Sequence, residues 1–212
     1  MSTTNVFAEL LIIGIETMAW IALLLFSLWG YDWIDFAIFN NLVIAIPLAA
    51  AAYIFGIMMD RVSDALLANA DHKIRKNVLG ERAAKSFSQL RSYILAKSPY
   101  LSNDLDYLRS RLRIMRSSAV NFSLLALTGA AFILSRSQVT PPSRYLAATT
   151  AFFSGVFLAT MSYYAWSASS ITYYLRLQTA FALLPEDDEP RENEEKPMRQ
   201  RNSNGHGSGN GA

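Results

Sequence analysis

The sequence predicts an all-α integral membrane protein with four transmembrane helices, a helical cytoplasmic extension between helices 2 and 3, and a disordered C-terminal tail. The 212 residues are 52% hydrophobic, and the apolar residues gather in blocks rather than spreading along the chain. Each block approaches the length of about 20 helical residues that crosses a hydrocarbon core roughly 30 Å thick. Basic residues concentrate instead in residues 60–118, with twelve Lys or Arg against six Asp or Glu.

Residues 1–59 are predicted to form the first transmembrane hairpin. Its first span covers about residues 6–29; we interpret it as retained, because it lacks the basic start of a signal peptide and its apolar run is too long. An aromatic and acidic segment typical of a membrane boundary follows. The second span covers about residues 36–59, and we expect a bend near Pro47.

Residues 60–118 form the predicted basic cytoplasmic region. The second span should continue into it as a helix to about Lys76. A further helix is expected around Phe87, Leu90 and Ile94, with its end at Pro99.

A third helix of this region is expected to begin at a cap formed by Ser102 or Asn103. Its apolar side chains repeat at alternating spacings of three and four residues, at Leu105, Leu108, Leu112 and Met115. Such a stripe requires a partner helix.

Residues 119–167 are predicted to form the second hairpin, with spans at about 119–134 and 145–166. The first of these is short unless its helix arrives already formed from the basic region. The loop between them, residues 136–144, contains two prolines that should break any helix. In the second span, Gly155 and Ala159 permit close contact with another helix.

The apolar face of the fourth span is expected to continue through residues 168–184. Residues 185–212 open with four acidic residues and end in a Gly/Asn/Ser-rich sequence. This tail has too little apolar surface to fold.

The distribution of basic residues predicts the orientation. Four spans place both termini on one side, and the loops on the other side hold only Arg136 and Arg144. We therefore expect a multi-pass protein of the cell membrane (the inner or plasma membrane), with both termini and residues 60–118 in the cytoplasm.

Composition argues against several activities. The chain has no Cys and only two His, far apart at positions 72 and 206, so we expect no metal site and no cofactor. Motifs for phosphate loops, zinc proteases and serine hydrolases are missing. A net charge of +2 does not predict nucleic-acid binding, and the interpretation leans away from an enzyme.

The most unusual residue is Glu16, which lies inside the first span. A charged carboxylate facing lipid costs a few kcal/mol, so Glu16 should face the bundle. Glu9, seven residues earlier, falls on nearly the same side of the helix.

We hypothesise an intramembrane polar site around these two carboxylates. The side chains at comparable depth that could join it are Tyr53, Asn121, Ser162 and Tyr163, with Arg61 or Arg116 as counter-ions. The site would respond to protons or cations; the simpler interpretation is that Glu16 only fixes helix packing.

Two further groups lie at the membrane boundary. Asp60 and Asp64 share a helix face and could hold Mg²⁺ on a lipid phosphate, although ion pairing or helix termination is the simpler interpretation. Anionic lipid headgroups are the expected contacts of the basic run Arg109, Arg111, Arg113 and Arg116.

Three functions remain open. The leading one is a non-enzymatic interaction or scaffold module that binds a cytoplasmic protein partner through its cytoplasmic helices. The alternative is an oligomeric ion channel or membrane-perturbing effector with Glu16 on the conduction path. A membrane-surface enzyme using Asp60 and Asp64 is the third. A homo-oligomer is a further possibility, because four helices have difficulty in shielding the polar residues of the spans from lipid, namely Glu16, Asn40, Asn41 and Asn121.

Overall fold

The described part of the chain folds into four long α-helices. A computed structural model describes residues 3–32, 42–81, 87, 92, 99–136 and 140–183. The helices are α1 (Thr3–Trp29), α2 (Leu42–Leu79), α5 (Pro99–Arg136) and α6 (Pro141–Leu183). These residues contain no strand, which confirms the all-α class.

Each helix includes a segment long and apolar enough to cross a membrane. The segments are Val6–Trp29, Val43–Leu79, Asp104–Arg136 and Pro141–Ala180. The last three are longer than a bilayer requires, because α2, α5 and α6 continue past their apolar parts without a break. The short third span is thereby explained, since α5 enters it already formed.

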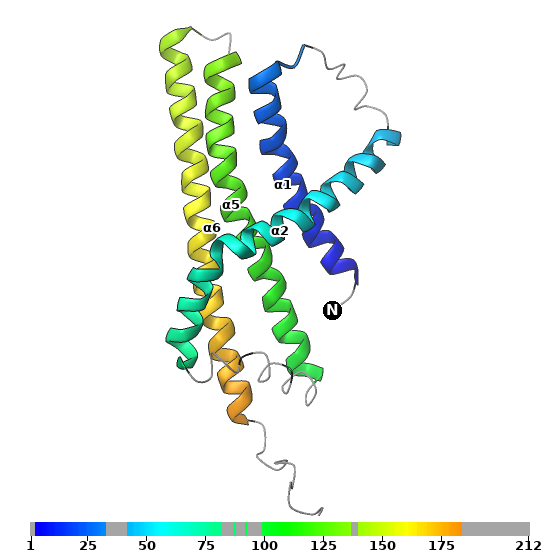
Figure 1. The fold of residues 1–212 in the computed structure, drawn as a ribbon, viewed down its shortest axis with the longest axis vertical. Helices are drawn as coiled ribbons and strands as arrows, with labels where there is room; N and C mark the ends of the chain where they lie inside the picture. Colours follow the sequence, from blue (N-terminus) through cyan, green and yellow to red (C-terminus); the bar gives the residue numbers. More distant parts are fainter. Residues whose placement is uncertain are drawn as a thin grey trace, which may run out of the picture.

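Three helices run roughly along the length of the molecule and the fourth crosses them. Figure 1 shows α1, α5 and α6 in this lengthwise arrangement, whereas α2 passes obliquely across them and turns in its second half to run beside α6. Pro47 lies inside α2, which is helical on both sides of it.

Glycine allows α1 and α2 to cross with their backbones in contact. A Cβ atom on Gly14 would overlap the carbonyl oxygen of Ala52, and one on Gly56 would overlap that of Leu10. The two glycines thus occupy the crossing point, where no side chain fits.

The α5–α6 interface uses the same principle with small residues. A Cβ atom on Gly155 would lie 2.6 Å from the Cβ of Ala126, and both Ala126 and Ala159 are buried. The prediction that Gly155 and Ala159 face another span is confirmed, with α5 as the partner.

The carboxyl end of α1 is closed by a glycine and an arginine. Gly30 adopts a φ of 80° and its N–H donates to the Phe26 carbonyl at 3.0 Å, as glycine does after a helix. The Arg136 guanidinium donates to the carbonyls of Ser27, at 3.3 Å, and Leu28, at 2.9 Å. A cation at the negative end of the helix dipole ties the end of α5 to the end of α1.

Beyond the apolar parts lies a second packed region, which we call the helical extension. It comprises residues 60–79 of α2, 99–116 of α5 and 167–183 of α6. Its buried core consists of Leu105, Tyr173, Tyr174, Leu177 and Ala180, with Leu108, Leu112 and Phe87 packed against it. The partner helix that the leucine stripe requires is therefore α6, and Met115 also faces it through the Ser169 hydroxyl at 3.6 Å.

Two predicted helix starts were wrong, for the same reason. α5 begins at Pro99 and α6 at Pro141, so Ser102 and Asn103 lie inside α5 and do not cap it, and the loop ends before residue 144. Proline is well suited to the first position of a helix, because the N–H group that it lacks would have no partner there.

Some predictions fall outside the described residues. These are the start of the second span at residues 36–41, the residues around Leu90 and Ile94, and the tail at 185–212.

Candidate functional site

Glu16 of α1 faces α5, and its carboxylate accepts hydrogen bonds from uncharged side chains. The Ser118 hydroxyl is 2.9 Å from each of its carboxylate oxygens, and the Asn121 amide donates to Glu16 Oε2 at 3.2 Å. Glu16 is half-buried, whereas both partners are buried. Asn121 is one of the expected partners; Ser118 was not foreseen.

Asn121 is the centre of this hydrogen-bonded group. It is 1% exposed, and its amide lies 3.2 Å from the Ile13 carbonyl. Its Oδ1 accepts from the Trp20 indole at 3.2 Å and lies 3.2 Å from the Thr17 hydroxyl, which is also 2.8 Å from the Ile13 carbonyl. We call Glu16, Thr17, Trp20, Ser118 and Asn121 the inner cluster.

Three other expected members of the site lie elsewhere. The Tyr53 ring stacks near Phe7, with ring centroids 5.2 Å apart. The Tyr163 ring packs against Trp166 at 5.5 Å, and Ser162 is half-buried one residue away. In the described part of the chain, the hydrogen bonds to the Glu16 carboxylate come from Ser118 and Asn121.

A second group of polar side chains lies near the start of α1, at the middle of α2 and in the first half of α5. We call it the outer cluster; it contains Glu9, Asp60, Asp64, Ser110, Arg113 and Arg116. The outer cluster is built from ion pairs and differs in this from the inner one.

Two arginines of α5 hold the carboxylates of the outer cluster. Arg113 lies 3.5 Å from Glu9 and 3.6 Å from Asp60. Arg116 lies 3.0 Å from Asp60 and also pairs with Asp64. Through these contacts α5 is bound to both α1 and α2.

Glu9 and Glu16 both face α5, as their spacing predicted. The Ser110 hydroxyl donates to Glu9, about two turns of α5 away from the Ser118 contact with Glu16. The hydroxyls of Ser110 and Ser118 were not predicted as partners of these carboxylates, whereas Asn121 was. Their positions along α5 offered a signal, because residues 110, 113, 117, 118 and 121 recur at helical spacing and share one face.

The four arginines predicted to contact lipid are used in different ways. Arg113 and Arg116 are mostly buried in ion pairs. The guanidinium of Arg111 sits 5.7 Å from the centre of the Tyr107 ring. Arg109 is exposed and lines the cavity described next.

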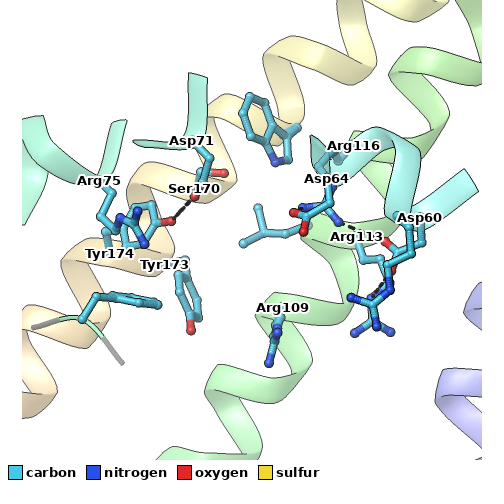
Figure 2. A pocket seen from close by; sticks show the side chains of 14 residues that line it. Asp60, Asp64, Asp71, Arg75, Arg109, Arg113, Arg116, Ser170, Tyr173 and Tyr174 are labelled. Carbon is cyan, nitrogen blue, oxygen red and sulfur yellow. Dashed lines mark hydrogen bonds and ion pairs between the residues drawn. The ribbon is translucent and has the colours of Figure 1, made fainter. Parts of the chain in front are cut away.

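A cavity of about 270 Å³ lies between α2, α5 and α6 at the top of the helical extension. Asp60, Asp64, Asp71, Arg75, Arg109, Arg113, Arg116, Ser170, Tyr173 and Tyr174 are labelled around it in Figure 2. Asp71 accepts a hydrogen bond from the Tyr174 hydroxyl at 2.9 Å, which links α2 to α6 below the outer cluster.

The arrangement does not favour a divalent metal. Asp60 and Asp64 are both engaged by Arg116, which competes with any cation for their oxygens. Among the described residues, no group of three or more His, Asp or Glu side chains could hold a metal ion.

Comparisons with protein-family models, with curated proteins and with solved structures found no match to this chain.

Proposed function

We propose that the protein is a multi-pass membrane protein that acts as a non-enzymatic interaction module, with the helical extension in the cytoplasm as its binding part. The observation that carries this proposal is the extension itself. Three helices run past their apolar parts and pack around a separate core with Leu177 and Leu105 at its centre. A protein that needed only to cross the membrane would not require it.

The outer surface of the extension bears apolar side chains suited to a protein partner. Leu175 is 49% exposed and Ile171, one turn earlier on α6, is 40% exposed. Tyr107 of α5 is also exposed. Large apolar side chains exposed on a helix away from lipid are typical of binding surfaces.

The contacts of the polar clusters support this proposal over the two alternatives. A conduction path through Glu16 requires its carboxylate to face an opening, and Ser118 and Asn121 occupy its oxygens instead. A phosphate-processing enzyme using Asp60 and Asp64 requires them to bind a metal, and Arg116 holds both.

The orientation is tested by single-cysteine labelling, which the cysteine-free chain permits without removing native thiols. Tyr107→Cys lies in the extension and Thr140→Cys at the opposite end of the bundle. We expect a membrane-impermeant maleimide to label Thr140→Cys in intact cells and Tyr107→Cys only after permeabilisation. If Tyr107→Cys were labelled in intact cells and Thr140→Cys only after permeabilisation, the extension would lie outside the cytoplasm and the proposal would be wrong.

The binding role is tested by photo-crosslinking in cells. A benzophenone amino acid replaces Leu175 in the extension or, as the matched control on the same helix, Leu146, which is 69% exposed at the other end of α6. We expect one discrete protein adduct at position 175, lost in Ile171→Glu, and none at 146. An adduct at the mass of two chains identifies the partner as a second copy.

Ion flux measured in proteoliposomes tests the channel alternative. No adduct at position 175, together with an ion flux that Glu16→Gln abolishes, would replace the interaction module with the channel.

A further inference from the structure

We propose that the cavity between α2, α5 and α6 binds a phosphate-bearing group. The first argument is the balance of charge. Five arginines line the cavity against three aspartates, a formal excess of two positive charges. Glu9 also faces Arg113 from outside the lining, and after it is counted an excess of one remains.

The carboxylates of the lining are already engaged, so they do not repel an anion with their full charge. Asp60 and Asp64 accept from Arg113 and Arg116. Asp71 accepts from the Tyr174 hydroxyl. The other arginines of the lining are Arg61, Arg75 and Arg109.

Arg75 and Arg109 reach the cavity from two different helices. Arg109 of α5 is exposed and lines the cavity. Arg75 of α2 lies with its guanidinium carbon 5.3 Å from the centre of the Phe87 ring. Guanidinium groups that face a cavity from two sides suit the several oxygens of a phosphate.

Buried donors without partners give a second, independent indication. Ser170 lines the cavity and is 1% exposed, and its hydroxyl has no hydrogen-bond partner among the described residues. The same holds for the Nε atoms of Arg75 and Arg116, both of which also line the cavity. Buried polar groups usually have partners, and all three of these groups can donate to an oxyanion.

The volume and position of the cavity restrict the ligands that could bind there. About 270 Å³ is slightly below the volume of pockets for drug-sized ligands, roughly 300–1,000 Å³, and suits a phosphate ester or diphosphate. The cavity lies beside the residues where the apolar parts of α5 and α6 end. A lipid phosphomonoester and a soluble phosphate share the chemistry that this site would recognise.

The test uses the full chain in nanodiscs at one salt concentration. One arm titrates inorganic pyrophosphate into phosphatidylcholine nanodiscs and follows binding by calorimetry. The other arm compares thermal stability in phosphatidylcholine nanodiscs with and without phosphatidic acid. Binding in the first arm identifies a soluble ligand; stabilisation by phosphatidic acid identifies a lipid headgroup.

Arg109→Gln and Arg111→Gln form a matched pair, since both residues are exposed on α5 and only Arg109 lines the cavity. We expect Arg109→Gln to weaken binding about tenfold, the scale of one charge-assisted hydrogen bond, and Arg111→Gln to leave it unchanged. Ser170→Ala should weaken binding about threefold.

Two results would overturn the proposal. One is no response to pyrophosphate or to phosphatidic acid in either arm. The other is an equal loss of binding affinity in Arg109→Gln and Arg111→Gln. This would mean that the anion is attracted by the overall positive charge of α5 and does not bind in the cavity.

Discussion

The inner and outer clusters hold the same two helices together, about two turns apart, with different chemistry. In the inner cluster, Glu16 accepts hydrogen bonds from the uncharged Ser118 and Asn121. In the outer cluster, Glu9 and Asp60 face Arg113. The two carboxylates of α1 thus have a different kind of partner according to their position along the helix.

The cost of burying charge accounts for this difference. A cation deep in an apolar segment costs a few kcal/mol even before it finds a partner, so neutral donors are the less costly way to satisfy Glu16. At the end of the span, an arginine keeps part of its side chain near water and can pair with a carboxylate. The comparison predicts that the inner cluster depends on hydrogen-bond geometry and the outer cluster on charge.

The largest effect is expected at the crossing that positions α1 for both clusters. In Gly14→Ala, the new methyl group would overlap the backbone of Ala52, so α1 and α2 must separate. We expect the Tm in detergent to fall by at least about 5 °C. Gly129→Ala is the control, because its Cβ would meet only Leu23 at 3.9 Å. Equal Tm values for the two variants would show that the crossing does not position α1.

The next effect tests the geometry of the inner cluster. Asn121→Leu keeps the number and branching of the side-chain heavy atoms and removes the partners of Trp20 and Glu16, which we expect to destabilise the fold by about 2–3 kcal/mol. Chemical unfolding in mixed micelles measures the change. The Ser123 hydroxyl donates to the Ala119 carbonyl of its own helix, so Ser123→Ala should cost less than about 0.5 kcal/mol. If Asn121→Leu lost no more unfolding free energy than Ser123→Ala, Asn121 would not be the centre of the inner cluster.

A smaller effect, with a salt signature, is expected in the outer cluster. Arg113→Gln leaves Glu9 and Asp60 with fewer cations, and we expect a loss of about 1–2 kcal/mol, because the pair is partly exposed to solvent. The difference from the unmodified protein should shrink between 0.05 and 1 M NaCl, since salt shortens the screening length from more than about 10 Å to about 3 Å. The loss in Asn121→Leu should not change with salt. If both losses changed equally with salt, the outer cluster would not depend on charge more than the inner cluster does.

The smallest effect is expected at Glu16 itself. Glu16→Gln retains an oxygen that accepts from Ser118 or Asn121, so we expect less than about 1 kcal/mol and no dependence on salt. Chemical unfolding of Glu16→Gln and Arg113→Gln under the same conditions tests whether Glu16→Gln loses less stability. A larger loss at Glu16 than at Arg113 would show that the negative charge of Glu16 stabilises the bundle.

Much of the fold could be predicted because it depends on local pattern. The apolar blocks located all four helices, and the leucine stripe at 105, 108 and 112 correctly required a partner. The position of Glu16 within an apolar run predicted that it faces another helix, and its carboxylate meets α5. The helix starts were misjudged because Pro99 and Pro141 were interpreted as helix breakers, when a proline in the first turn favours a helix.

The candidate sites were less predictable, because their members come from different helices. Asn121 was one of several polar side chains at a similar depth to Glu16, and depth alone does not distinguish it from Tyr53 or Tyr163. Ser170 and Arg75 lie far apart in the sequence and share no motif. The path of α2 across the bundle brings them to one cavity.

The sequence by itself determined that the chain is helical, which segments are apolar enough to span a membrane, and that α1 carries two carboxylates on one side. These properties follow from the period of the helix and from the transfer of side chains out of water. Only the tertiary structure decided which side chains meet those carboxylates and where a cavity forms. Those contacts depend on the relative rotation and crossing of whole helices, which glycine at positions 14 and 56 permits and no single helix encodes.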